Sequence, residues 1–313
     1  MKILIIGGSG FVGAHLFEYL SKKPDHEIVL SSRHRSDRFM RLDLKNYEES
    51  KETLFNCKFD KIFHLGFQSS VYVSFEQPFD TIKDNIVSTM NLLKICQQLK
   101  ETKIIIAGTS EIYKSSNYAL KESSDTDPRN PYTISKLAID QFSRLMAKHL
   151  DMKITVLRLF NHTGPGQGSR FVLSSFAFQL AKIKLNLQEP IIKVGNLEIK
   201  RDFSDVRDVV RAYDLVSNSE SIYGDVFNVC SGTAFKLKDL LDRLIEISGV
   251  DVKVEQDQKL LRKSDSICYY GTFAKIFKRF GWKPQIAITK TLEDLYNYWL
   301  EKLKNDYQIQ EKI

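Results

Sequence analysis

Residues 2–13 read KILIIGGSGFVG. The unbroken run of isoleucine and leucine from Ile3 to Ile6 predicts a strand that is buried on both faces of a parallel sheet. Glycines follow at once, and from Phe11 to Leu20 the apolar residues recur at helical spacing. Ile28 to Leu30 predicts a second strand. A strand, a helix and a strand within about 30 residues form a βαβ unit.

The same alternation continues through the first half of the chain. Further elements are predicted at Ile62–Leu65 (strand), Thr81–Leu99 (helix), Ile104–Ala107 (strand), Tyr132–Leu150 (helix) and Ile154–Leu159 (strand). This repetition predicts an α/β fold with a doubly wound (Rossmann) parallel sheet, whose ligands bind at the carboxyl ends of the strands. Beyond Asn161 the pattern loosens, until a last helix is predicted near Thr291–Lys304.

Composition excludes several classes of protein. The chain has 313 residues, 42% of them apolar and 27% charged, which is typical of a globular protein and not of disordered or coiled-coil chains. Its four cysteines show no Cys-x-x-Cys spacing, so we expect reduced thiols, no metal site and a cytoplasmic location. No apolar run is long enough for a signal peptide or a membrane span. The net charge of +7 comes from scattered residues, which argues against nucleic-acid binding and suits a polyanionic small substrate.

The glycines after the first predicted strand are typical of a phosphate-binding turn. Gly7, Gly10 and Gly13 form Gly-x-x-Gly-x-x-Gly between that strand and the first helix. The first glycine permits a tight turn, the second lets the backbone approach a pyrophosphate, and the third allows close helix packing. The unpaired N–H groups and the dipole at the helix N-terminus favour an anion. The alternative is an ordinary turn between a strand and a helix.

We therefore predict two parts of the chain. Residues 1–160 would form a dinucleotide-binding domain, and residues 161–313 a smaller α+β substrate-binding lobe. The chain is expected to return to the first domain near residues 203–229.

The end of the second strand favours NADP(H) over NAD(H). An NAD site usually has a carboxylate there, but residues 30–35 read LSSRHR and contain none. Arg33 and Arg35 could pair with a 2′-phosphate. The alternative is that both arginines are simply hydrated surface residues.

Two segments predict catalytic chemistry. Tyr132 and Lys136 stand four residues apart at the start of a long predicted helix, so they share a face. We expect the lysine ammonium to lower the pKa of the phenol below its usual value of about 10 and to make it a proton shuttle. Tyr-x-x-x-Lys alone is common and is usually structural. However, Thr109 and Glu111 follow a buried strand and place a hydroxyl and a carboxylate at the expected crevice.

These motifs, in this order, resemble those of the extended short-chain dehydrogenase/reductases that act on nucleotide sugars. The resemblance covers nearly the whole chain. It implies that Thr109 binds the reacting oxygen of the sugar, that Tyr132 transfers the proton, and that Lys136 holds the nicotinamide ribose. It also implies that Asp43 approaches the adenine and that Asn85 borders the site. The full set expected to contact the cofactor is Gly7, Gly10, Phe11, Val12, Gly13, Arg33, Asp43, Leu44, Leu65, Tyr132 and Lys136.

The second half of the chain is similar to the GDP-sugar branch. The segments that carry this similarity are RLFNHTGPGQ (158–167), EPIIKVGNL (189–197) and RDFSDVRD (201–208). They look most like GDP-6-deoxy-4-keto-mannose reductases, which make GDP-rhamnose, and next like GDP-mannose 4,6-dehydratases. The resemblance implies that Asn161 contacts the substrate and that Arg201 and Arg262 clamp its diphosphate. His162 is expected to be structural.

Some positions depart from the pattern of these relatives. Gly66 and Phe67 replace a usual pair of alanines, Lys114 replaces a glycine, and Lys263 replaces a proline. Gly66, Phe67 and Lys114 are expected to border the nicotinamide and sugar pocket.

Three functions remain open at this stage. The favoured one is NADPH-dependent reduction of the C4 keto group of a GDP-linked 4-keto sugar, because relatives that are dehydratases are longer and carry an extra basic segment. A 4,6-dehydratase with tightly bound NADP, using Glu111 as the base, or a nucleotide-sugar epimerase is the alternative. The third is a nucleotide-sensing protein without turnover. It is disfavoured because the chain keeps the full set of Thr109, Tyr132 and Lys136.

The predicted helices Thr81–Leu99 and Tyr132–Leu150 carry apolar residues on more than one face. The resemblance implies a homodimer in which this pair of helices forms a four-helix bundle with its symmetry mate. The alternative is that the second lobe covers these residues.

Overall fold

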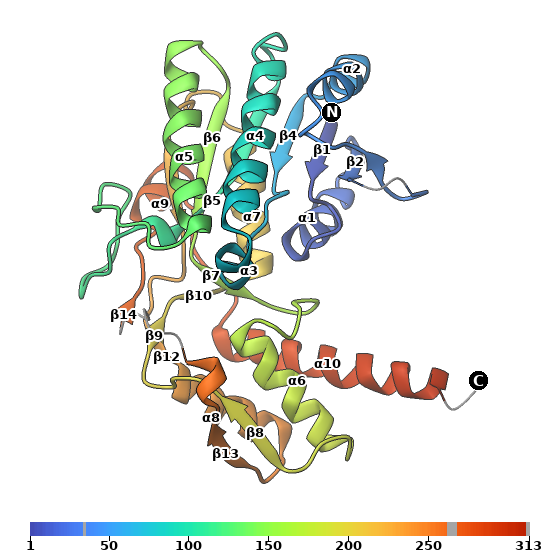
Figure 1. Ribbon diagram of the computed structural model, residues 1–313, viewed down its shortest axis with the longest axis vertical. Helices are drawn as coiled ribbons and strands as arrows, with labels where there is room; N and C mark the ends of the chain where they lie inside the picture. Colours follow the sequence, from blue (N-terminus) through green and yellow to red (C-terminus); the bar gives the residue numbers. More distant parts are fainter. Residues whose placement is uncertain (34–35, 262–267, 311–313) are drawn as a thin grey trace.

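The computed structural model describes residues 1–33, 36–261 and 268–310. A seven-stranded sheet with helices on both faces forms its larger part (Figure 1). The strands are β1 (Lys2–Ile6), β2 (Glu27–Ser32), β3 (Met40–Arg41), β4 (Lys61–His64), β5 (Lys103–Thr109), β6 (Ile154–Leu159) and β11 (Val226–Val229). Their order is β11-β6-β5-β4-β1-β2-β3, and neighbouring strands run parallel. This confirms the predicted doubly wound sheet, and the order reverses between β1 and β4.

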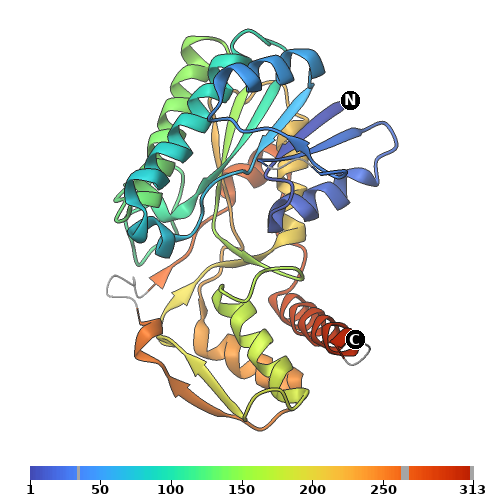
Figure 2. The same ribbon diagram turned by 45° about the vertical axis from the view of Figure 1, so that its right-hand side comes forward.

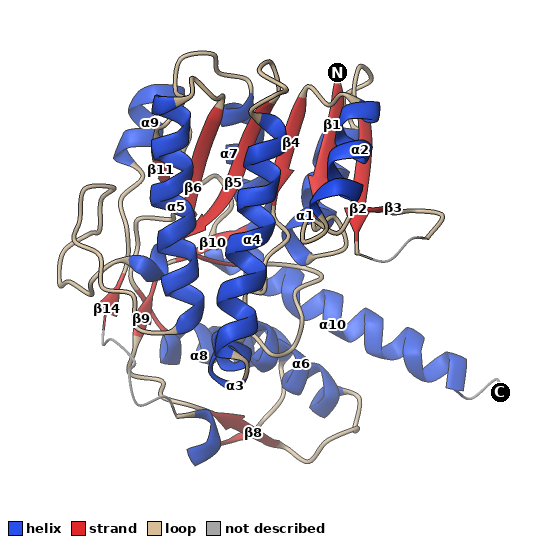
Figure 3. Cartoon of the chain, turned by 45° about the horizontal axis from the view of Figure 1, so that its top comes forward, coloured by secondary structure: helices blue, strands red, loops and turns tan. Residues whose placement is uncertain are grey.

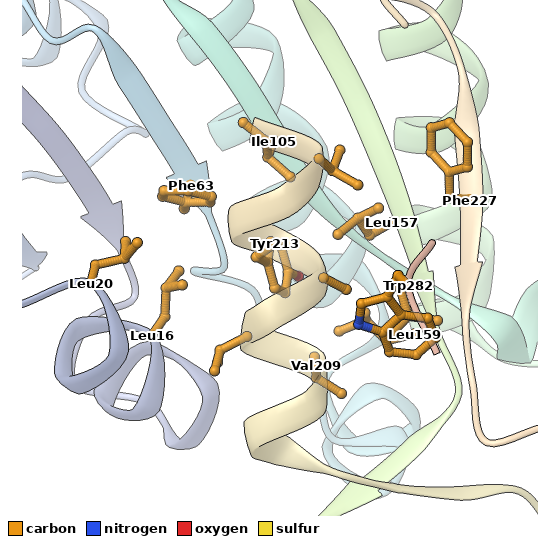
Figure 4. Close-up of a cluster of buried hydrophobic side chains, with 14 of the residues drawn as sticks. Leu16, Leu20, Phe63, Ile105, Leu157, Leu159, Val209, Tyr213, Phe227 and Trp282 are labelled. Carbon is orange, nitrogen blue, oxygen red and sulfur yellow. The ribbon is translucent and has the colours of Figure 1, made fainter. Parts of the chain in front are cut away.

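Alternating side chains of each strand pack on opposite faces of the sheet. Ile3 and Ile5 belong to a core under α1 (Phe11–Ser21), α7 (Val206–Ser217) and α9 (Ala274–Phe280). Figure 4 shows part of this core, in which side chains of α1 and α7 meet those of β4, β5, β6 and β11. Leu4 and Ile6 belong to a second core, under α2 (Tyr47–Cys57), α4 (Pro78–Cys96) and α5 (Pro131–His149), the helices in front of the sheet in Figure 3. The sheet is therefore buried on both faces, as the apolar runs predict.

A smaller lobe lies beyond the carboxyl ends of the strands (Figure 2). It contains α6 (Val172–Lys184), β8 (Ile191–Val194), α8 (Leu237–Ser248), β13 (Lys253–Gln256) and α10 (Ile288–Gln310). These elements share a core of their own, in which Leu180, Leu244 and Leu292 are fully buried. The C-terminal end of α10 extends away from the rest of the molecule (Figure 1).

Short strands join the two parts. β7 (Asn161–Thr163) pairs with β10 (Phe203–Asp205), while β9 (Lys200–Arg201) lies between β12 (Phe235–Lys236) and β14 (Cys268–Tyr269). The chain then returns to the main sheet through α7 and β11, and again through α9. The division at residue 160 remains a prediction.

The remaining described elements are short. They are α3 (Val71–Glu76) and the 3-10 turns Ser110–Ile112 and Gln258–Leu260. Within the described residues, none of the helices combines the length and the apolar character needed to span a bilayer.

Candidate active site

The carboxyl ends of β1, β4, β5 and β6 point toward the smaller lobe (Figures 1 and 2). Most of the residues that the sequence suggests for a site lie along this edge.

The turn between β1 and α1 requires its glycines. Gly7 has φ +83°, and a Cβ there would lie 2.8 Å from the Cα of Gly66. A Cβ on Gly13 would lie 2.4 Å from the carbonyl oxygen of Gly7. Gly10 is the N-cap of α1 and has no side chain to cap the helix, whose first turn contains no acidic residue. The first N–H groups of α1 are therefore placed to bind an anion, and these residues fit a dinucleotide pyrophosphate.

Phe11 and Val12 are the first two residues of α1. Phe11 lies on the side of the smaller lobe, and Val12 lies on the side of the core. The Phe11 ring stacks on His162, with centroids 6.1 Å apart and planes within 1°. His15 packs edge-on against Phe11 and hydrogen-bonds through Nε2 to the carbonyl oxygen of Pro165 at 2.7 Å. His162 is held by a 2.9 Å hydrogen bond between Nδ1 and the carbonyl oxygen of Phe160, and burial lowers its pKa. These contacts give His162 a packing role, while Val12 packs against the core under α1.

The outer edge of the sheet carries the candidates for the adenosine half of a cofactor. Arg33 follows β2 directly and is exposed, whereas Arg35 lies outside the described residues. Asp43 follows β3, and its Oδ1 accepts a 3.1 Å hydrogen bond from the backbone N–H of Lys45. Leu44 beside it is buried. Leu65, which follows β4, donates its N–H to the carbonyl oxygen of Ile6 at 2.9 Å, which places it at the glycine turn.

Thr109 and Tyr132 meet at the end of β5. This strand extends two residues beyond the predicted end at Ala107, because Thr109 pairs with Leu159 of β6. Tyr132 lies in the first turn of α5, and its phenol is hydrogen-bonded to the Thr109 hydroxyl. Glu111 follows closely, is exposed, and donates its N–H to the Thr109 Oγ1 at 3.2 Å. The Thr109 and Tyr132 hydroxyls and the Glu111 carboxylate therefore lie close together at the carboxyl end of β5.

The expected effect of Lys136 on Tyr132 is wrong in this structure. Burial raises the pKa of the Tyr132 phenol far above its usual value, the Glu111 charge raises it further, and the Thr109 hydrogen bond opposes both. Lys136 does not lower it, because the lysine side chain runs to β5 and its Nζ donates to the carbonyl oxygen of Ala107. Four-residue spacing puts both residues on one face, but it does not decide where a long side chain ends. At neutral pH Tyr132 therefore keeps its proton.

The Lys136 amine is enclosed by side chains that the motifs did not assign. Its Nζ lies 3.1 Å from the centroid of the Phe67 ring, and burial lowers its pKa well below the ordinary value. The Phe67 ring also packs against His64, with centroids 4.2 Å apart. His64 is fully buried, its pKa is lowered to about 3 by burial and by Lys136, and its Nε2 is hydrogen-bonded to Thr89 Oγ1 at 3.1 Å. The only sign of this arrangement in the sequence is Phe67 itself, which stands where similar proteins usually have alanine.

Asn85 of α4, which the resemblance predicts to border the site, fixes the segment after β4. Its Oδ1 accepts from the Gln68 N–H at 2.9 Å, and its Nδ2 donates to the Gln68 carbonyl at 3.1 Å. The same amide donates to Ser135 Oγ at 3.1 Å. Asn85 therefore ties this segment to both α4 and α5.

The substrate-side candidates lie in the short strands. Asn161 begins β7 opposite Phe203, and Arg201 ends β9 beside Tyr269 of β14. Both are partly exposed, while Arg262 lies outside the described residues. The structure therefore pairs Asn161 with a residue only two positions after Arg201, but it does not place Arg262.

Asp202, which the motifs did not single out, joins three segments beneath this region. Its carboxylate accepts from the N–H and the hydroxyl of Ser231, both at 2.7 Å, from Gly232 N–H at 3.0 Å and from Gly271 N–H at 3.2 Å. Because these segments follow β11 and β14, Asp202 fixes the backbone around Arg201.

A second unassigned network supports the segment that follows Glu111. Arg158 of β6 is buried and pairs with both oxygens of Asp140, at 2.8 and 3.0 Å. It also donates to the Tyr113 hydroxyl at 2.8 Å, which in turn donates to Asn228 Oδ1 at 2.7 Å. In the described part of the chain, no group of three or more histidine, cysteine or acidic residues is arranged to hold a metal ion.

Comparison with known proteins agrees with this geometry. Residues 4–295 match the family described as GDP-mannose 4,6 dehydratase. The GDP-6-deoxy-D-mannose reductase of Pseudomonas aeruginosa is 32% identical, over 97% of this chain and 99% of the relative. The structure of RMD from Pseudomonas aeruginosa, complexed with NADPH, matches 96% of this chain and 99% of its own at a TM-score of 0.86 and 32% identity. A UDP-glucose 4-epimerase from Thermotoga maritima, solved with UDP-glucose, matches 97% and 100% at a TM-score of 0.88 and 25% identity.

Proposed function

Because the chain belongs to the GDP-mannose 4,6-dehydratase family of extended short-chain dehydrogenase/reductases, we propose that it reduces the C4 keto group of a GDP-linked 4-keto sugar with NADPH. The substrate would be GDP-6-deoxy-4-keto-mannose or a close analogue. The observation that carries the proposal is the hydrogen-bonded Thr109 and Tyr132 pair, beside a buried Lys136, at the end of β5. Near full-length similarity to a GDP-6-deoxy-D-mannose reductase supports the choice of sugar.

The residues at β5 suit protonation of a developing alkoxide. When bound, NADPH supplies the hydride to the carbonyl carbon. The Thr109 hydroxyl would hydrogen-bond the carbonyl oxygen, and Tyr132 would donate its proton to that oxygen. The raised pKa of Tyr132 keeps the proton on the phenol until it is needed. Once the sugar oxygen carries that proton, it no longer needs the single O–H of Thr109, which would then donate to the buried phenolate.

The other residues would bind and orient. The N–H groups at the start of α1 would hold the pyrophosphate of the cofactor, and Lys136 its nicotinamide ribose. Arg33 supports NADPH over NADH, because an exposed guanidinium after β2 can pair with a 2′-phosphate. Asn161 and Arg201 would contact the sugar and its diphosphate. We retain Arg262 in this role from the sequence motif alone.

A 4,6-dehydratase is the second candidate, and one observation favours it. The exposed Glu111 carboxylate stands two residues after Thr109 and is close enough to raise the pKa of Tyr132. A carboxylate in this place could remove the C5 proton before water leaves from C6.

Two incubations separate these functions. With GDP-6-deoxy-4-keto-mannose, we expect stoichiometric oxidation of NADPH, slower oxidation of NADH, and a product two mass units heavier than the keto sugar. With GDP-mannose and no reductant, we expect no change in mass. Loss of water from GDP-mannose would instead make the protein a dehydratase. Interconversion of C4 epimers without net use of cofactor would make it an epimerase.

The Tyr132→Phe variant tests the proton donor. We expect kcat to fall by roughly 10²- to 10⁴-fold, because general-acid catalysis contributes a factor of that size. Binding of NADPH, followed by its fluorescence, should remain within about twofold. Tyr118→Phe is the matched control, because Tyr118 is 81% exposed. Unchanged turnover in the Tyr132 variant would refute the assignment.

We also propose that the chain forms a homodimer through α4 and α5. Phe79 and Met90 are exposed on α4 and lie about three helical turns apart, so they share a face. Ile134 and Leu145 are exposed on α5 with the same spacing. The smaller lobe does not cover these four residues, so apolar surface is available for a second copy.

A further inference from the structure

Phe67 covers the amine that the proposed function assigns to the cofactor. The Lys136 Nζ lies 3.1 Å from the centroid of the Phe67 ring, so the ring lies directly against the amine. On another side Nζ donates to the carbonyl oxygen of Ala107. Lys136 is 2% exposed as a result. The negative face of the ring attracts the charged form of the lysine, which opposes the lowering of the Lys136 pKa by burial, and this contact is strongest where water is excluded.

The backbone on both sides of Phe67 is fixed. Before it, Leu65 N–H is bound to the Ile6 carbonyl at 2.9 Å, and Gly66 packs against the glycine turn at Gly7. After it, the Asn85 amide binds both the N–H and the carbonyl of Gln68. The Phe67 side chain, in contrast, is only partly buried. Rotation about its side-chain bonds is therefore the motion by which the ring can leave Lys136.

The ring and a ribose would need the same position. A lysine ammonium has three donors. One is used by Ala107, and the Phe67 ring covers another side of Nζ. Ribose hydroxyls can accept from Nζ only after the ring moves aside. When ribose hydroxyls bind Nζ, the Phe67 ring therefore loses its packing against Lys136 and His64.

We propose that Phe67 is a cap on Lys136 that competes with the nicotinamide ribose and rotates away when the cofactor binds. This rests on the proposed function, since Lys136 must be a ribose ligand. The capped form does not bind the nicotinamide half, so it weakens the apparent affinity for the whole dinucleotide. It leaves the adenosine half unaffected, because that half lies at the other end of the site, near Arg33 and Asp43.

Binding of NADPH and of 2′,5′-ADP to the full-length chain tests the cap. The fragment 2′,5′-ADP carries the 2′-phosphate but no second ribose. We expect Phe67→Ala to lower the Kd for NADPH by roughly 30-fold, the factor that corresponds to losing one desolvated cation–π contact. The Kd for 2′,5′-ADP should stay within about twofold. Phe67→Leu keeps apolar cover but has no π face, so its Kd for NADPH should lie between those of the wild type and the alanine variant.

Titration calorimetry gives both constants without turnover. If the wild type binds NADH more tightly, NADH and ADP serve as the pair. An unchanged or raised Kd for the dinucleotide in Phe67→Ala overturns the cap and makes the ring part of the binding surface. An equal change for the fragment overturns it as well, because the effect is then general to the site. A wild type that binds neither dinucleotide nor fragment overturns the proposed function, and the cap with it.

Discussion

Asp202 is a single buried carboxylate that joins three segments of the chain, but its charge lowers the stability of the folded protein at neutral pH. The Asp202 carboxylate is 0% exposed and accepts four hydrogen bonds from three residues. Among the described residues, no lysine or arginine side chain forms an ion pair with it. Burial raises the pKa of the Asp202 carboxyl to about 6, and the hydrogen bonds from Ser231, Gly271 and Gly232 oppose this only in part. At neutral pH the charged form is therefore less stable in the folded protein than in the unfolded chain.

The pH dependence of Asp202→Asn tests this cost. A carboxyl with a raised folded pKa stabilises the protein most below its unfolded value of 3.8, and this contribution is lost as pH rises through about 6. The shift corresponds to about 3 kcal/mol at 1.36 kcal/mol per pKa unit. We expect the unfolding free energy of the wild type, relative to the variant, to fall by that order between pH 4 and 8. Urea unfolding of both proteins measures the difference, and a flat difference would contradict the assignment.

At the scale of the element, helix α5 presents Tyr132, the proposed proton donor, in a defined position because the start of the helix is fixed. The Asn130 side chain accepts from the Thr133 N–H at 2.8 Å, and the Thr133 hydroxyl accepts from the Asn130 N–H at 3.2 Å. This capping box, with Pro131 in the first turn, satisfies N–H groups that a helix leaves unpaired. Tyr132 lies inside the same turn, so the cap also sets the position of its phenol.

We expect Asn130→Ala to lower the free energy of unfolding by about 1 kcal/mol, which is the usual value of an N-cap. Because Tyr132 is within the capped turn, kcat should fall severalfold while NADPH affinity changes little. Asn130→Asp keeps the acceptor oxygen and should restore both stability and kcat. A loss of stability without any change in kcat would show that the cap does not position the phenol. Thermal or urea unfolding and initial rates provide the two readouts.

At the scale of the whole molecule, the exposed apolar residues on α4 and α5 predict the assembly. The two helices pack side by side against one face of the sheet (Figure 3). Their outer faces carry Phe79, Met90, Ile134 and Leu145, which are 85%, 47%, 46% and 59% exposed. A second copy related by a two-fold axis would bury this patch of four residues against the same patch of its partner.

We expect Met90→Lys to shift the protein from dimer to monomer, because it places like charges across the two-fold axis. Phe277→Lys on α9 is the matched control, since Phe277 is 49% exposed on the opposite side of the sheet and should leave the dimer intact. Sedimentation velocity distinguishes the two forms. A wild type that sediments as a monomer would refute the proposed dimer.

The sequence by itself determined the sheet and the glycine turn, and it supplied the residues proposed as the catalytic set. Four-residue apolar runs, helical periodicity and glycines are local signals, because each arises within a few neighbouring residues. They predicted β1, α1, α4, β5, α5 and β6 to within a few residues. Helix α2 was missed because only Ser50 and Leu54 are buried in it, although Asn46 and Glu49 form the kind of N-terminal pair that could have revealed it.

Only the tertiary structure decided how the catalytic residues are surrounded. Phe67 and Lys136 are far apart in the sequence, and they meet because α5 packs beside the segment that follows β4. The pKa of Tyr132 is raised because burial and the Glu111 charge together outweigh the Thr109 hydrogen bond, and burial is a property of the packed chain. The Asp202 hydrogen bonds likewise join three segments that follow three different strands, β9, β11 and β14. Periodicity records which face of an element is buried, but it carries no information about which distant side chain lies against that face.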